Sequence, residues 1–192
     1  RTDFEYELLD TGVFADDLYF DVFVEYAKET PEDLAIRITV ANRGPEEASI
    51  HLLPSLWFRN TWSWKANMPK PSMHAENGAI RAEHADLGLR YLHCEGTPEL
   101  LFTENETNTG LLWKLPNTTP YVKDAFHQYV VNGRREAVNP ERRGTKAAAH
   151  YTLTVPAGGE RTITLRLTDD AASTAPAPAI FEQRLAEADS FY

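Results

Sequence analysis

Alternation between apolar and polar residues is the main pattern along this chain. In residues 34–40, every second residue is a large aliphatic one. Because successive side chains of a strand point to opposite faces, this period of two predicts half-buried β-strands. The same spacing predicts strands at residues 20–26, 87–93, 100–102, 149–155 and 163–167. Asn-Arg-Gly-Pro at residues 42–45 supplies turn residues that end the preceding strand.

Residues 50–58 form a longer apolar run that contains Pro54. Proline has no N–H to donate, so this strand is expected to lie at a sheet edge or to bend at Pro54. The strands at 149–155 and 163–167 flank Pro-Ala-Gly-Gly, which predicts a β-hairpin. About nine or ten short strands without intervening helices predict an all-β fold, an antiparallel two-sheet β-sandwich.

The composition changes after Thr168. Residues 171–178 are rich in Ala, Ser and Pro and are typical of a linker. Phe181, Leu185, Ala188 and Tyr192 then recur at helical spacing, which predicts a short helix whose apolar stripe needs a partner. We therefore expect a sandwich domain over residues 1–170 and a linker with the start of a helix over 171–192. Because the chain also begins at Arg1 without Met, we expect it to be a piece of a longer protein.

The charge balance excludes several kinds of partner. With 29 acidic and 19 basic residues, the net charge is −10. Phosphate-binding surfaces need clustered Lys and Arg, so we expect neither nucleic acid nor an anionic membrane as partner. No apolar run approaches the ~18 residues of a membrane span, so we expect a soluble protein. Without a signal sequence, we expect it to be cytoplasmic.

The sequence gives little support for a metal site or for a cysteine nucleophile. Cys94 is the single cysteine, which excludes an internal disulfide and a Cys-based zinc site. The six histidines do not stand at metal-ligand spacing, so we expect no metal and no cofactor. On its strand, Cys94 is expected to be a small buried hydrophobic residue rather than a nucleophile.

A cluster of aromatic residues is the first candidate for binding. Trp57, Trp62 and Trp64 fall within eight positions, together with Arg59 and Asn60. Aromatic faces stack on sugar rings, and Arg and Asn can donate hydrogen bonds to sugar hydroxyls, so the cluster suits carbohydrate. Alternatively, Trp57 ends a core strand and the other two pack beneath a loop, since Trp is highly buried on average.

A polar loop is the second candidate. Glu104, Asn105, Glu106 and Asn108 place two carboxylates and two amides close together. They could bind sugar hydroxyls or Ca²⁺, or form a glycosidase pair, although adjacency in sequence does not give the separation of ~5–10 Å that this pair needs. Asx-turns and helix capping explain such residues equally well.

Two later segments are weaker candidates. Residues 120–129, with Lys123 and Asp124, form either a binding loop or a loop that leads into a strand at 129–131. Residues 144–151 lack the spacing of a phosphate-binding loop and are read as structural, with an Ala run that lets another segment approach closely.

Several long segments resemble a known group of proteins. They are residues 6–14, 19–26, 53–64, 101–108, 121–124 and 144–148, the third reading Leu-Pro-Ser-Leu-Trp-Phe-Arg-Asn-Thr-Trp-Ser-Trp. In this order they are similar to the N-terminal part of bacterial glucosidase-like proteins related to glycoside hydrolase family 63, also described as mannosylglycerate-hydrolase-like. The resemblance implies a β-sandwich of the supersandwich type that precedes an α/α barrel holding the catalytic carboxylates.

The resemblance implies no catalytic residue within this chain, because the barrel is not part of it. It implies that sandwich loops pack on the barrel and wall its sugar site. The matching candidates are Trp57, Arg59, Asn60, Trp62, Trp64, Glu104, Asn105, Glu106, Asn108, Lys123 and Asp124. Expected partners are the barrel, an oligosaccharide or glycoside, and a second copy if the isolated chain associates. A stand-alone carbohydrate-binding module and a purely structural or protein-interaction sandwich are the alternatives.

Overall fold

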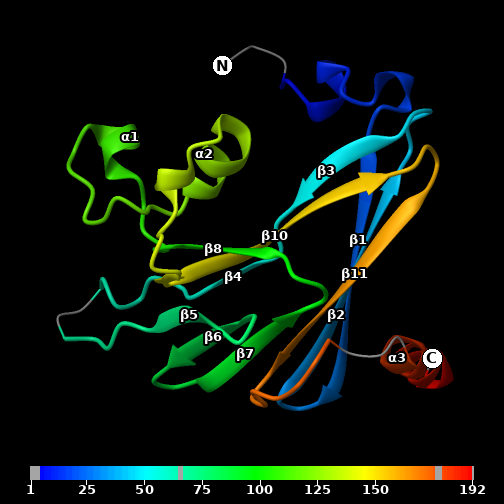
Figure 1. Cartoon of the computed structure of the whole chain (residues 1–192). Helices are drawn as coiled ribbons and strands as arrows, with labels where there is room; N and C mark the ends of the chain where they lie inside the picture. Colours follow the sequence, from blue (N-terminus) through cyan, green and yellow to red (C-terminus); the bar gives the residue numbers. More distant parts are fainter. Residues whose placement is uncertain (1–4, 65–66, 176–178, 192) are drawn as a thin grey trace.

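The computed structural model describes residues 5–64, 67–175 and 179–191. Its strands form two antiparallel sheets that pack face to face, with a short helix at the C-terminal end (Figure 1). The predicted all-β, two-sheet sandwich is therefore confirmed. No helix in these three ranges is long and apolar enough to cross a membrane.

The larger sheet contains seven strands. In spatial order they are β1 (Phe20–Thr30), β2 (Asp33–Asn42), β11 (Glu160–Thr168), β7 (Gly88–Cys94), β6 (Ala79–His84), β5 (Ser72–Glu76) and β9 (Arg143–Gly144). The alternating runs at 20–26, 34–41, 87–93 and 163–167 all contribute to it. β5 and β6 join through Asn77 and Gly78, both with positive φ, which is the backbone that a two-residue hairpin turn requires.

The smaller sheet is organised around β10 (Lys146–Val155). On one side β10 pairs with β3 (Ala48–Leu52) and then with β4 (Ser55–Trp57); on the other it pairs with β8 (Glu99–Thr103). Pro54 separates β3 from β4, as its missing N–H predicts, and its carbonyl accepts a hydrogen bond from Ala149 N at 3.0 Å. The apolar run 50–58 is thus one interrupted edge of this sheet.

The hairpin predicted at residues 149–167 is wrong. β10 and β11 do not pair; they belong to different sheets, and residues 156–159 carry the chain from one to the other. Asn42 holds this crossing, because its Nδ2 donates to Val155 O at 3.1 Å and its N donates to Gly159 O at 2.9 Å. Alternation predicts that each strand has one apolar face, but it does not predict which strand lies beside it. The apolar faces of β10 and β11 both point into the core, from opposite sheets.

The core between the sheets is made of aliphatic and aromatic side chains from both. Phe102 of β8, Met73 of β5 and Ile80 of β6 are almost completely buried, and Ala147 and Ala149 of β10 lie against them. The alanines leave room for larger neighbours, so the small residues of 144–151 have a packing role, as predicted.

Two helices intervene between β8 and β9, which the strand reading did not predict. They are α1 (Thr109–Trp113) and α2 (Ala125–Asn132), and both lie beside the smaller sheet in Figure 1. The strand predicted at 129–131 is therefore wrong. Phe126 and Tyr129 stand three residues apart, and both are buried against Leu101 and Ala148, a spacing that a helix satisfies. The described residues also contain the short 3-10 helices η1 (Leu8–Thr11), η2 (Ala15–Asp17) and η3 (Arg135–Ala137).

The predicted C-terminal helix is present as α3 (Ala179–Phe191). Phe181 of its predicted apolar stripe is buried against Ala27 and Ala35 of the larger sheet, whereas Leu185 is 58% exposed and Ala188 is also exposed. The Arg37 guanidinium lies 4.4 Å from the Phe181 ring centroid. Residues 176–178 of the predicted linker and Tyr192 of the predicted stripe lie outside the described residues.

Candidate functional site

Asn105 joins three segments that sequence analysis had selected separately. Its backbone N–H donates to Thr145 Oγ1 at 2.8 Å, and its side-chain Nδ2 donates to Phe58 O at 2.8 Å. Asn60 Nδ2 in turn donates to Asn105 O at 3.2 Å. The aromatic segment, the polar loop and the Gly144–Thr145 turn therefore meet at the end of the smaller sheet.

Glu104 is held in place by two donors. Because Thr145 Oγ1 accepts from Asn105 N, its own hydrogen is directed to Glu104 Oε2, at 2.7 Å. Lys70 Nζ lies 3.0 Å from the same oxygen and 3.7 Å from Glu106 Oε1. Glu106 also accepts from the Thr118 hydroxyl. One ammonium group thus bridges both carboxylates of the polar loop.

A polar groove of about 820 Å³ opens beside this cluster. Its lining includes Lys70, Ser72, Met73, His74, Glu104, Thr119, Tyr121, Asn139, Pro140, Glu141, Arg143 and Thr145. Such a volume lies within the range of about 300–1,000 Å³ that small-molecule sites occupy. Arg143 on its wall is paired, since its Nη2 lies 2.5 Å from Glu141 Oε2, and His74 Nε2 lies within hydrogen-bonding distance of Glu76 Oε2, at 3.3 Å.

Gly144 permits the close approach that forms this end of the groove. A Cβ at this position would lie 2.1 Å from Thr103 O, far inside van der Waals contact. Glycine alone lets β9 pass this close to the end of β8. The Gly-Thr dipeptide that sequence analysis read as structural therefore also shapes the groove wall.

Sequence analysis missed Lys70, Tyr121 as an individual residue, and Arg143. A signal for Lys70 existed, because it stands between Pro69 and Pro71, which restrict the backbone on both sides. Nothing in the sequence marked Arg143, which reaches the groove only because β9 pairs with β5.

Asn108 and Asp124 have structural roles. Asn108 Oδ1 accepts from Leu111 N at 3.0 Å and caps α1, while its Nδ2 donates to Asp124 Oδ2 at 3.1 Å. Asp124 is the residue before α2. The hydrogen bond to Asn108 Oδ1 is the helix-capping alternative that the sequence left open. The hydrogen bond between Asn108 and Asp124 connects α1 to the start of α2.

Lys123 is exposed, and its backbone is held on both sides, since its N–H donates to Glu106 O at 2.9 Å. Its carbonyl accepts from Lys146 Nζ at 2.7 Å, and that ammonium lies 4.9 Å from the Phe126 ring centroid. Burial, with the nearby Lys123 charge, lowers the pKa of Lys146 below its ordinary value.

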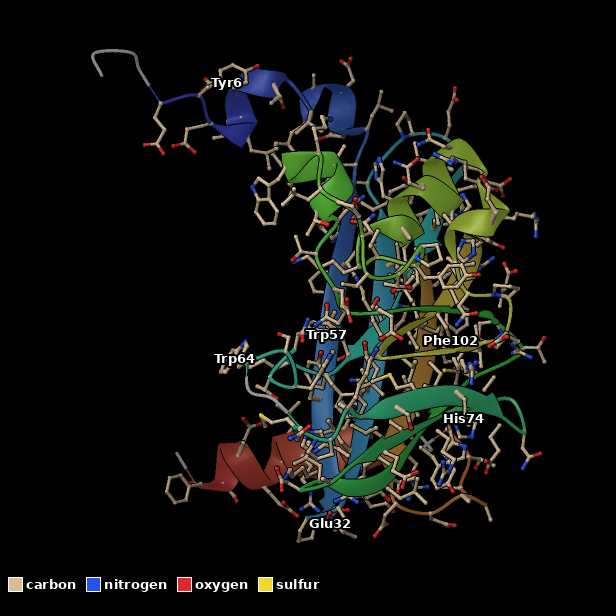
Figure 2. All side chains as sticks on the ribbon, turned by 90° about the vertical axis from the view of Figure 1, so that its left-hand side faces the viewer. Tyr6, Glu32, Trp57, Trp64, His74 and Phe102 are labelled. Carbon is tan, nitrogen blue, oxygen red and sulfur yellow. The ribbon has the colours of Figure 1, made fainter. Side chains whose placement is uncertain are left out.

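The aromatic cluster is not a buried unit. Trp57 is 57% exposed and Trp64 is 63% exposed, while Trp62 is half-buried. The interpretation of Trp57 as a core residue is therefore wrong, because the alternation along β4 turns Leu56 inward and Trp57 outward. Arg59 lies 4.8 Å from the Trp64 ring centroid, and Figure 2 shows Trp64 and the groove residue His74 on opposite sides of the molecule.

A second, apolar groove of about 290 Å³ runs along the open side of the sandwich. Val22, Val24 and Tyr26 of β1 form one wall, and Leu52 to Leu56 form the other. The three β1 side chains are 45–66% exposed. The larger sheet is wider than the smaller one, so the inner face of its edge strand is left uncovered.

The Cys94 thiol and the possible metal ligands give no sign of a reactive site. Cys94 packs at the edge of the core, and burial raises the pKa of its thiol to about 12, which keeps it protonated. In the part of the chain that the structure describes, no group of three or more His, Cys, Asp or Glu side chains is arranged to hold a metal ion.

The chain is similar to a protein of Saccharomyces cerevisiae (strain ATCC 204508 / S288c) named Uncharacterized protein YMR196W, with 33% identity over 220 residues. The match covers 92% of this chain and 20% of the yeast protein. No protein-family model matches the chain. The similarity thus concerns nearly the whole sandwich, and the chain spans about a fifth of the length of this curated relative.

Proposed function

We propose that this chain is a non-catalytic β-sandwich domain of a glucosidase-like protein related to glycoside hydrolase family 63. It packs against the α/α-barrel catalytic domain of the same protein and contributes to the wall of the sugar site. The proposal rests on the series of sequence segments that resembles such proteins, from residues 6–14 to 144–148. The fifth of the yeast relative that this chain matches agrees with a domain of a much longer protein.

The apolar groove along β1 is the observation that carries the packing role. Its wall places the half-exposed Val22, Val24 and Tyr26 beside Leu52 and Leu56. Contiguous apolar surface of this kind marks interaction sites in soluble proteins. An apolar protein surface, such as the outer helices of a barrel, would continue the core and cover it.

The open reading frame provides the first test. We expect it to continue into an α/α-barrel pattern, with paired helices at regular spacing. The purified chain should not hydrolyse a p-nitrophenyl α-glucoside, because the proposed function places both catalytic carboxylates in the barrel. Efficient turnover by the isolated chain, or a reading frame without a barrel, would overturn the proposal.

A stand-alone carbohydrate-binding module is the second candidate, and the exposed Trp64 with Arg59 against its ring favours it. Saturable binding of glucans or mannosides by the isolated chain, lost in Trp62→Ala and Trp64→Ala, would select this candidate. Trp113→Ala, which removes an exposed Trp of α1, is the matched control.

A further inference from the structure

We infer that the polar groove between Lys70, Glu104, Tyr121 and Arg143 binds a neutral polyhydroxylated ligand, a saccharide or glycoside. This site differs from the aromatic cluster at Trp57–Trp64. The inference deepens the proposed function by naming a sugar-contacting surface, and it rests on that function only for the expectation that a sugar is present.

Charge balance decides the class of ligand. Lys70 and Arg143 supply two positive charges to the lining, and Glu104 and Glu141 supply two negative ones. Each cation lies within 3.0 Å of a carboxylate oxygen, at Lys70–Glu104 and Arg143–Glu141. Because each cation already has a carboxylate partner, these two pairs offer no unpaired charge to attract a charged ligand, whereas a neutral ligand binds without disturbing either pair. The Lys70 ammonium also lies beside the carboxylates that a Ca²⁺ ion would need.

The groove still offers unused hydrogen-bonding groups. Glu104 is fixed through Oε2, and within the described ranges its Oε1 has no hydrogen-bond partner, so it can accept from a hydroxyl. The Tyr121 and Ser72 hydroxyls are likewise without partners among the described residues, and both line the groove. A wall that offers both donors and acceptors matches a sugar, whose hydroxyls do both.

Apolar surface lies between these polar groups. The Tyr121 ring, Pro71 and Pro140 line the same groove. A sugar presents C–H groups on the faces of its ring, and an aromatic side chain is suited to pack on such a face.

The wall is also preorganised. Thr145, which orients Glu104, is 1% exposed and is itself fixed by Asn105 N. Gly144 holds β9 against Thr103 by a close backbone approach. Side chains supported by such a framework lose little freedom on binding.

Titration followed by ¹H–¹⁵N NMR tests the inference on the whole 192-residue chain. Methyl α-D-glucopyranoside, methyl α-D-mannopyranoside and maltotriose are the neutral probes; glucuronate, glucosamine and CaCl₂ are the charged ones. We expect at least one neutral probe to give saturable shifts at Lys70, Tyr121 and Thr145. The charged probes should bind more weakly, by up to about fivefold, since a partly exposed ion pair contributes no more than this factor.

Three variants assign the contacts. Glu104→Gln should weaken binding of the neutral probe about tenfold, and Tyr121→Phe should weaken it less than Tyr121→Ala, since the ring remains. Glu160→Gln, which removes an exposed carboxylate outside the groove, should leave the affinity unchanged. Unchanged backbone spectra away from the groove show that each variant is folded.

Any of three results would overturn the inference. They are the absence of saturable shifts with every neutral probe, shifts confined to Trp57–Trp64, and tighter binding of a charged probe. None of these depends on whether the reading frame encodes a barrel, so the groove and the proposed function can fail separately.

Discussion

The two grooves of this sandwich are built in opposite ways. In the polar groove, Thr145 is fully buried and the charges of Lys70 and Glu104 are paired at 3.0 Å. In the apolar groove, Val24 is 45% exposed and Tyr26 is 66% exposed, beside the edge of the smaller sheet. The first surface has paired charges and a few free hydrogen-bonding groups, whereas the second leaves apolar area in water.

The difference indicates which kind of partner each groove suits. A surface with satisfied charges and a few free hydroxyls suits a small polar molecule that adds hydrogen bonds. An apolar surface gains about 25 cal/mol for each Å² removed from water, and only another protein surface covers much of it.

Gly144→Ala should have the largest effect, on the framework of the polar groove. The new Cβ would lie 2.1 Å from Thr103 O, so the backbone of β8 or β9 has to move. We expect a loss of about 3 kcal/mol or more in the free energy of unfolding. Urea denaturation measures it, with Gly110→Ala as control, because the added Cβ there makes an ordinary contact at 3.4 Å. Equal stability of both variants would contradict the close approach.

Thr145→Val should destabilise the same framework less. Valine has a similar shape but leaves Asn105 N and Glu104 Oε2 without the hydroxyl that joins them. We expect a loss of about 1–3 kcal/mol, the cost of unpaired buried polar groups. The exposed Thr154→Val in β10 is the control and should change the stability by less than about 0.5 kcal/mol. If the two variants unfolded at the same urea concentration, the hydroxyl would have no role in the framework.

Val24→Asp tests the apolar groove through association rather than stability. We expect the isolated chain to self-associate through this surface, and a charge at Val24 to weaken the association about tenfold, since a buried unpaired charge is unfavourable. Sedimentation velocity over a range of concentrations measures it. Val131→Asp, at an exposed position of α2, should leave association unchanged. A wild-type chain that stays monomeric at every concentration would contradict the expectation.

The Glu25–Arg37 pair, on the outer face beside the apolar groove, should have the smallest effect. The hydrogen bond from Arg37 lowers the pKa of Glu25 below its ordinary value of 4.5. The unfolded chain therefore takes up this proton more readily, so the contribution is present above pH 4.5 and is lost as the pH falls through the lowered pKa. Because Glu25 is 47% exposed, we expect less than about 1 kcal/mol.

Urea unfolding of wild type and Glu25→Gln measures this contribution. The difference in free energy between them should shrink between pH 6 and pH 3, whereas Glu160→Gln should show no such change. A difference independent of pH would mean that the ion pair contributes nothing.

The sequence predicted the elements of this fold better than their partners. Alternation at 20–26 and 34–41 correctly predicted two strands of one sheet, and Pro54 correctly predicted a break. The hairpin at 149–167 was wrong, because a period of two gives the face of a strand and not the strand beside it. The Asn77-Gly78 dipeptide, a strong hairpin signal, marks the β5–β6 turn that the strand reading did not identify.

The residues of the candidate site were also predicted only in part. Sequence selected Glu104 and Asn105 from their chemistry, and the structure brings them to Thr145, about 40 residues further along the chain, through hydrogen bonds. It could not select Lys70 or Arg143, because a single basic residue in a polar stretch has no pattern of its own. It left Trp57 open between a sugar-contacting and a core position, and packing in β4 turns it outward.

By itself, the sequence determined the all-β class, the faces of the alternating strands, the break at Pro54 and the C-terminal helix, because these depend on residues near one another in the chain. Only the tertiary structure decided that β10 and β11 face each other across the core, that 125–132 is a helix, and that Lys70 and Arg143 join Glu104. These outcomes depend on contacts between distant segments, whose free energy is a property of the packed molecule and not of any local pattern.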